Sequence, residues 1–307
     1  MSEIKSLTIG TRGSALALKQ TELVIEALEA NYPALQITTK IITTKGDKNL
    51  SPIPLDTIGK AWFTEELEEA LLSGEIDLAV HSLKDLPPET PKGLATTAVL
   101  KREDARDVLI SRSNVGLDQL PKGAIVGTDS IRRKAELLHR RPDLIIKSVR
   151  GNVDTRLCKL QQKDYDALML AAAGLSRLGK IDAVTQYLDP NEFVPAIGQG
   201  VLAAEARVDH TELWQLIKSI QDPETLEIVK AEQMFSKVVG GGCKLPVGCY
   251  AYFEGEEVTL HAMVGSMDAL KMVTKSAKGP RANAVSLAKQ LAKDLLREDI
   301  FSQELDN

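Results

Sequence analysis

One pattern occurs twice in this chain, and it restricts the fold more than any other feature of the sequence. Each copy is a short strand, a glycine-containing turn and a helix. The first copy has a strand over residues 6–10 and a helix over 14–30, where Ser14 is the expected N-cap. The second copy has a strand over 124–126 and a helix over 131–140. The chain therefore contains two versions of one βα unit.

Two further segments repeat in the same way. Residues 74–80 and 164–170 each read as a polar lead-in to a continuous apolar strand. Continuous apolar strands between helices indicate a sheet that is covered on both faces. The sequence thus predicts two related α/β domains of about 100 residues each. Their strand-to-helix turns should lie at the carboxyl ends of strands, where open α/β sheets bind ligands.

A third part of different character begins near residue 218. Asp222, Pro223 and Glu224 form a strong helix start, and that helix should run to about residue 239. Strands such as 258–264 follow, and a closing amphipathic helix over 284–297 should turn Val285, Leu291 and Leu295 inward. We predict a small α+β domain here. The expected division is 1–99 with 196–217, then 100–195, then 218–307.

Positive charge is concentrated in one part of a chain whose net charge is −5. Residues 132–159 hold nine lysines and arginines against three acidic residues. A solvated face and a focused anion site both explain such a segment. Arginines also stand beside the strand-to-helix turns, where helix N-termini favour anions. Only 4% of residues are aromatic, so an organic polycarboxylate fits better than nucleic acid.

Two segments stand out as candidates for chemistry. Asp85 follows a buried strand together with Ser82 and Lys84, so it is either a catalytic carboxylate or part of an exposed turn. Cys243 lies in a glycine-rich run over 240–248, which suits a thiol presented for covalent use. A helix end followed by an ordinary turn with a small buried cysteine explains that run equally well.

Other sequence features predict the cellular location, the absence of a metal and a mobile loop. Three cysteines, the absence of an N-terminal targeting segment and the absence of an apolar run of about 20 residues predict a cytoplasmic protein outside the membrane. Four scattered histidines show no metal-ligand spacing, and we expect no metal. Residues 45–60 contain two prolines and two glycines beyond Lys45, and we expect a mobile surface loop that acts as a lid.

Five motifs together resemble the porphobilinogen deaminase family. They are HSLKDLP at 81–87, GTDSIRR at 127–133, RGNVDTR at 150–156, PAIGQG at 195–200 and GGCKLPVG at 241–248. The resemblance implies two α/β domains like those of periplasmic binding proteins, with a cleft between them, and a small C-terminal α+β domain. It also implies a dipyrromethane cofactor on Cys243 through a thioether. Such an enzyme is a transferase of haem biosynthesis that joins four porphobilinogen molecules, releases ammonia at each addition and then releases hydroxymethylbilane.

The resemblance also implies roles for individual residues. Asp85 is the expected catalytic residue, binding pyrrole N–H groups and stabilising the cation left by ammonia. The expected cofactor-binding residues are Cys243, Lys84, Asp85, Thr128, Ser130, Arg132, Arg133, Arg150, Gly151 and Arg156. The expected substrate-binding residues are Arg12, Ser14, Arg177 and Gln199. The sequence departs from the family pattern at Gln233, Leu245 and Asp129. Asp129 stands where serine is common, and its charge weakens a carboxylate anchor unless it turns away.

Two other functions remain open on sequence grounds. A solute-binding or sensor protein for a small polyanion would use the two α/β domains but would need neither Cys243 nor Asp85. A nucleic-acid-binding protein would use residues 132–159 and would show a steep salt dependence. The favoured reading has porphobilinogen and the growing oligopyrrole as ligands, no nucleic acid or membrane partner, and a monomeric state.

Overall fold

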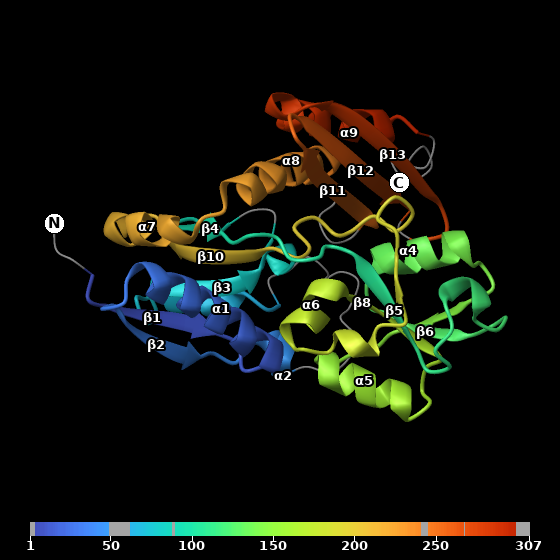
Figure 1. The fold of residues 1–307 in the computed structure, drawn as a ribbon, viewed down its shortest axis with the longest axis horizontal. Coiled ribbons are helices and arrows are strands. Elements are labelled where there is room, and N and C mark those ends of the chain that lie inside the picture. The colour runs from blue at the N-terminus through green and yellow to red at the C-terminus, as the bar shows by residue number, and fades with distance from the viewer. Residues whose placement is uncertain (1–3, 49–61, 88–89, 241–244, 267, 299–307) are drawn as a thin grey trace. The chain divides into compact units, whose positions relative to one another are not determined.

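The computed structural model describes residues 4–48, 62–87, 90–240, 245–266 and 268–298. The chain divides into two compact units. Unit 1 consists of residues 1–50, 60–103 and 200–226, and unit 2 consists of 51–59, 104–199 and 227–307. Figure 1 shows the helices and strands of both units. In the described ranges no helix is both long enough and apolar enough to cross a membrane.

Unit 1 is built on a five-stranded sheet with the strand order β2-β1-β3-β10-β4. The strands are β1 (Ser6–Thr11), β2 (Gln36–Ile41), β3 (Leu78–Ser82), β4 (Leu94–Val99) and β10 (Leu202–Arg207). Strand β1 runs parallel to β2 and β3, whereas β10 runs antiparallel to β3 and β4. The helices are α1 (Ala15–Asn31), α2 (Lys45–Lys48), α3 (Glu65–Leu72) and α7 (Thr211–Ile217).

Helices cover both faces of this sheet. Leu78 and Val80 of β3 belong to the apolar cluster that contains residues of α1 and α7. Ala79, which points the other way, belongs to a cluster with Leu67 and Leu71 of α3. Because successive side chains of a strand alternate between faces, β3 is buried on both sides. This arrangement confirms the prediction made from its continuous apolar sequence.

Unit 2 contains a second five-stranded sheet with the order β7-β6-β8-β5-β9. Its strands are β5 (Asp107–Ser111), β6 (Ile125–Gly127), β7 (Ile145–Lys147), β8 (Ala167–Ala171) and β9 (Gln186–Tyr187), and its helices are α4 (Ile131–Arg140), α5 (Val153–Gln161) and α6 (Ala172–Arg177). Strand β6 is parallel to β7 and β8, and β5 is antiparallel to β8. The pattern matches that of unit 1 strand by strand, so the predicted pair of related α/β sheets is confirmed.

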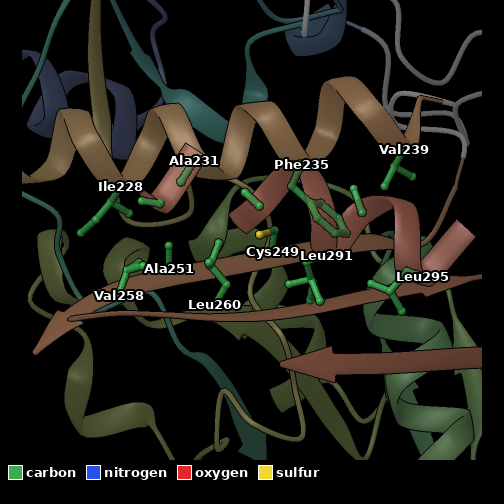
Figure 2. Packing of buried hydrophobic residues seen from close by; sticks show 14 of the residues in the cluster. Ile228, Ala231, Phe235, Val239, Cys249, Ala251, Val258, Leu260, Leu291 and Leu295 are labelled. Atoms are coloured by element: carbon green, nitrogen blue, oxygen red, sulfur yellow. The ribbon is translucent and has the colours of Figure 1, made fainter. Parts of the chain in front are cut away.

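Unit 2 also contains a three-stranded antiparallel sheet with two helices. The strands are β11 (Val247–Glu254), β12 (Glu257–Gly265) and β13 (Met272–Pro280), and the helices are α8 (Pro223–Val239) and α9 (Ala284–Leu296). Figure 2 shows Phe235 of α8 among Cys249 of β11, Leu260 of β12 and Leu291 of α9. The α+β character of this part is confirmed. The predicted residue boundaries of three domains, and a cleft between the first two, stay predictions.

Two local expectations were wrong. Val285 of α9 is 38% exposed, whereas Leu291 and Leu295 are buried. At 3.6 residues per turn Val285 points about 120° away from Leu291, and Ala284 and Ala288 occupy the inner face instead. The expected loop at 45–60 begins with the helical turn α2, which covers Lys45–Lys48. Residues 49–60, and with them the predicted lid, lie outside the described residues.

Candidate active site

In unit 1 the predicted site residues lie at one edge of the sheet. Arg12 and Ser14 follow β1, and Ser82, Lys84 and Asp85 end or follow β3. Because β1 and β3 are parallel, these segments leave the sheet at the same edge. The Gln20 amide of α1 donates to the Ser82 hydroxyl at 2.8 Å and ties the two segments together.

Asp85 lies in the short 3-10 helix Leu83–Asp85 and is exposed. The N–H of Leu83 donates to the carbonyl oxygen of Val201 at 3.0 Å, so β10 holds the start of this turn. Lys84, in the same turn, is partly exposed. The turn thus holds a carboxylate and an ammonium group directly after a strand whose first four residues are buried.

Arg12 already holds a carboxylate of the chain. Its guanidinium forms a bidentate contact with Asp47 of α2 and stacks over the ring of Phe63, with 4.2 Å between the guanidinium carbon and the ring centroid. Burial alone would raise the pKa of Asp47, but hydrogen bonds from Arg12 and Thr44 and the Arg12 charge hold that pKa below its ordinary value. Ser14 is the N-cap of α1, as predicted, and accepts from the Ala17 N–H at 3.2 Å.

In unit 2 two helix N-termini follow the parallel strands β6 and β7. Ser130 caps α4 by accepting from the Arg133 N–H at 3.3 Å, and Asn152 caps α5 by accepting from the Thr155 N–H at 2.9 Å. The hydroxyl of Thr128, which is buried, accepts from the Ser130 N–H at 3.2 Å. Both N-termini therefore direct N–H groups and a partial positive charge toward the carboxyl edge of this sheet.

Arg150, Gly151 and Arg156 surround the start of α5. Gly151 has a φ of +112°, and a Cβ there would lie 2.7 Å from the Thr155 side chain, so only glycine fits the turn. Arg156 Nε donates to the Gly151 carbonyl oxygen at 2.8 Å. Arg150 Nη1 lies 4.0 Å from Asp129 Oδ2. Asp129 thus faces an expected anchor and does not cap the helix, since Ser130 does so.

Arg132 and Arg133 are buried in a network of acidic partners. Arg132 contacts Asp107 and Glu136 at 2.8 Å each, and Arg133 contacts Asp107 at 2.7 Å. Gln199, also fully buried, donates to Asp107 at 2.9 Å. The predicted ligand contacts of Arg132, Arg133 and Gln199 stay predictions. In this structure all three side chains contact Asp107.

The two carboxyl groups of this network differ in their ionisation. Burial alone would raise the pKa of Asp107, but the charges of Arg132 and Arg133 keep that pKa well below its ordinary value. Burial raises the pKa of Glu136 to about 8, against the pull of Arg132. Asp107 is therefore the carboxylate that balances the arginines at neutral pH, and Glu136 carries a proton for much of the time.

Sequence analysis missed Asp47, Asp107 and Glu136 as partners of the site arginines. The signal for Glu136 was present, because it stands four residues after Arg132 on the same helix. Asp107 and Asp47 lie 26 and 35 residues from the arginines they bind, and no local spacing connects them. Arg177, the last residue of α6, is partly exposed at the end of the segment that follows β8.

The predicted cofactor-bearing residue, Cys243, lies outside the residues that the structure describes. Helix α8, which precedes it, ends at Val239, and Gly240 follows with a φ of +71° and donates its N–H to the Ser236 carbonyl oxygen. The other cysteines occupy different settings, since Cys158 is exposed on α5 and Cys249 is buried in β11.

Comparison with known proteins covers nearly the whole chain. A family model described as porphobilinogen deaminase, dipyromethane cofactor binding domain, matches residues 7–215. A second, described as porphobilinogen deaminase, C-terminal domain, matches residues 226–297. The chain is 43% identical over 310 residues to a porphobilinogen deaminase from Oceanobacillus iheyensis, covering 99% of this chain and 100% of that protein.

Other relatives agree with these matches. A porphobilinogen deaminase from a Roseiflexus species is 45% identical over 293 residues, which cover 95% of this chain and 96% of that protein. Another from Syntrophobacter fumaroxidans is 44% identical over 291 residues, with 94% of each chain covered. With the matched motifs on the turns that follow β3, β6 and β7, the chain belongs to the porphobilinogen deaminase family.

Proposed function

We propose that this chain joins four porphobilinogen molecules head to tail on a dipyrromethane group held by Cys243, then releases the linear tetrapyrrole hydroxymethylbilane by hydrolysis, with water supplying its hydroxyl group. One ammonia leaves at each addition. The observation that carries the proposal is the match to whole-length relatives, which covers 99% of this chain and all of one relative. Asp85, within the first family motif, is exposed in the turn that follows a buried strand, where a ligand can reach it.

The described residues fit an acidic pyrrole group. Such a group carries carboxylates, and the capped N-termini of α4 and α5 stand beside Arg150 and Arg156. A guanidinium next to a helix N-terminus favours carboxylates through charge and paired hydrogen bonds. When bound, the dipyrromethane supplies the free pyrrole carbon on which the product grows.

Asp85 is the proposed catalytic residue. Its carboxylate accepts hydrogen bonds from pyrrole N–H groups of the substrate and stabilises the positive charge that develops as ammonia leaves. A carboxylate placed where charge develops lowers the barrier more than one that only binds the ground state. Lys84, in the same turn, offers an ammonium group to a nearby carboxylate of the ligand.

The remaining predicted residues are proposed as carboxylate and backbone anchors. Arg12, Ser14, Arg177 and Gln199 are proposed for the substrate. Lys84, Thr128, Ser130, Arg132, Arg133, Arg150, Gly151 and Arg156 are proposed for the cofactor and growing chain. Arg12 would exchange Asp47 for a ligand carboxylate, because Asp47 occupies the Nε and Nη2 donors that a bidentate ligand carboxylate would need. A monomeric state, a cytoplasmic location and the absence of a nucleic-acid partner stay predictions.

Mass spectrometry of the denatured protein, combined with an ammonia-release assay, tests the proposal. The wild-type mass should exceed the sequence mass by that of two linked pyrroles. Cys243→Ser should lose both the added mass and turnover, whereas the matched variant Cys158→Ser should keep both, because Cys158 is merely an exposed residue of α5. Asp85→Ala should keep the added mass and lose ammonia release by at least about 100-fold.

Three results would count against the proposal. Full activity with unmodified Cys243 would show that the enzyme does not need a cofactor bound through a thioether at Cys243. Near-normal rates in Asp85→Ala would show that Asp85 is not a catalytic residue. Binding of porphobilinogen by the mass-shifted wild type with no ammonia release would favour the solute-binding alternative.

A further inference from the structure

A cluster of buried ionisable side chains lies in unit 1 behind the Asp85 turn, and the function proposed above uses none of them. His81 of β3 and Glu205 of β10 have side chains that are 4% and 1% exposed, and His81 Nε2 lies 3.2 Å from Glu205 Oε2. Glu68 of α3 is 6% exposed. His81 is the residue before Ser82, where β3 ends, and precedes Asp85 by four positions.

The strand register explains why these groups meet. His81 points to the same face of β3 as Ala79, and that face is covered by α3. In the antiparallel pairing of β3 with β10, Ala203 stands opposite His81 and Glu205 stands opposite Ala79. His81 and Glu205 are therefore diagonal neighbours on one face of the sheet, close enough for long side chains to touch.

Three polar atoms of this cluster lie buried, away from solvent. Within the described residues, His81 Nε2, Glu205 Oε2 and Glu68 Oε1 are buried and make no aligned hydrogen bond. Native proteins pair more than about 90% of such atoms. Burial raises the pKa of Glu68, the charges of Glu205 and Glu65 raise it further, and Thr64 and His81 oppose the rise. The 3.2 Å contact between His81 and Glu205 therefore lies beside a third buried polar side chain.

We propose that His81, paired with Glu205, is a positioning residue for Asp85: the pair fixes the end of β3 against β10. The inference rests on the catalytic role proposed for Asp85. The Asp85 turn is only three residues long, so its position follows the position of Ser82 and Leu83. The Leu83 hydrogen bond to Val201 immediately follows the pair and depends on the same register.

Loss of the pair should act on the chemistry more than on substrate binding. A catalytic group displaced by about 1 Å can lose about 100-fold in rate. The cluster is buried on the face that α3 covers, so its loss should leave the substrate contacts proposed for Arg12 and Arg177 in place. A fall in kcat with a nearly constant KM is the expected signature.

The test compares His81→Gln, Glu205→Gln, their double variant and Glu68→Gln with His139→Gln, which alters an exposed histidine of α4. His81→Gln and Glu205→Gln should each lower kcat by about 10- to 100-fold with KM within about threefold, and the double variant should lose little more than either. Glu68→Gln, which leaves the contact between His81 and Glu205 intact, and His139→Gln should keep wild-type rates. The double variant replaces both members of the pair with amides and serves if a single variant does not fold.

Two readouts do not depend on activity. The imidazole nitrogen shifts of His81 should change in Glu205→Gln and remain in Glu68→Gln. Amide hydrogen exchange at Leu83 should accelerate in His81→Gln. Additive losses in the double variant, unchanged kcat with a lower melting temperature, or unchanged Leu83 exchange would each overturn the positioning role. A wild type that releases no ammonia would refute the proposed function instead, while the nitrogen shifts would still decide whether the pair exists.

Discussion

At the scale of single residues, the arginines of this protein differ in how firmly the chain's own carboxylates hold them. Arg132 and Arg133 are buried against Asp107, and Arg12 holds Asp47 in a bidentate contact. Arg150 Nη1 lies 4.0 Å from Asp129 Oδ2. A ligand carboxylate must compete with such partners. Asp129 should therefore limit how well Arg150 binds a ligand carboxylate.

Asp129→Ser should speed chain elongation by about two- to fivefold, because it removes a carboxylate that competes with the growing chain for Arg150. The mass of the enzyme-bound chain, followed against time, measures the change. Arg150→Ala should slow elongation while leaving the melting temperature nearly unchanged. Asp118→Ser, which removes a 62% exposed partner of Arg140, is the matched control and should leave elongation unaltered. Slower elongation in Asp129→Ser would show that Asp129 helps to hold the ligand.

At the scale of elements, α4 is joined to its sheet by charge as well as by apolar packing. Arg132 and Arg133 lie in its first turn and reach Asp107, the first residue of β5. Arg132 also donates to the Val194 carbonyl oxygen at 2.7 Å, and Glu232 of α8 accepts from the Gly198 N–H at 2.7 Å. Buried charges thus fix the segment 194–199 between α4 and α8. Removing one partner should leave an uncompensated charge in the interior.

Asp107→Asn should lower the free energy of unfolding by at least about 3 kcal/mol, because two buried arginines lose their carboxylate. Asp118→Asn is again the surface control and should change it by less than about 1 kcal/mol. Urea unfolding at pH 7 measures both. An Asp107→Asn protein as stable as the wild type would mean that water or another group compensates the arginines.

Glu136 should make stability depend on pH in the opposite sense to an ordinary salt-bridged acid. Burial raises its folded-state pKa from 4.5 to about 8, so the native state binds a proton more tightly than the unfolded chain does. The contribution of Glu136 to the free energy of unfolding is fully present below pH 4.5 and is lost as pH rises through about 8. Glu136→Gln keeps the neutral form, so urea midpoints measured from pH 5 to 9 should fall less steeply in this variant. If the midpoints of the wild type and Glu136→Gln fall in parallel with pH, Glu136 is not the group that binds the proton.

At the scale of the whole molecule, the chain leaves unit 1 after Glu103 and returns to it at Gly200. These two points are hydrogen-bonded, since the Glu103 N–H donates to the Gly200 carbonyl oxygen at 3.1 Å. Gly200 has a φ of +87°, and a Cβ there would lie 2.3 Å from the Glu103 carbonyl oxygen. Only glycine permits the backbone to pass so close. A larger residue at position 200 must therefore shift the backbone of Glu103 or its own.

Gly200→Ala should destabilise the protein and reduce turnover together, because it strains the backbone and forces the two connections apart. Gly179→Ala is the matched control, since its φ is +64° but nothing lies within 4 Å of a new Cβ. The control should cost about 1 kcal/mol from strain alone. Thermal unfolding and ammonia release measure both variants. Equal losses in the two would show that only strain, and not the contact with Glu103, matters at Gly200.

The sequence by itself determined the local elements. Ser14 before an apolar helix, and Asp222 with Pro223 at the start of α8, are signals contained within a few residues, and the structure confirms both helices. The family motifs are equally local, so the family and the place of Asp85 after a strand could be predicted. Periodicity was less reliable for α9, where small alanines at 284 and 288, and not Val285, face the core.

Only the tertiary structure decided which distant side chains meet. His81 and Glu205 are neighbours because β10 enters the sheet antiparallel beside β3, although long stretches of chain separate them. Asp107 reaches Arg133 because β5 lies beside β8 and next to the start of α4. Helix caps and strand alternation act over a few residues, and sequence spacing records them. Strand order and burial act across the whole chain, and they determine which arginines lie buried against the chain's own carboxylates.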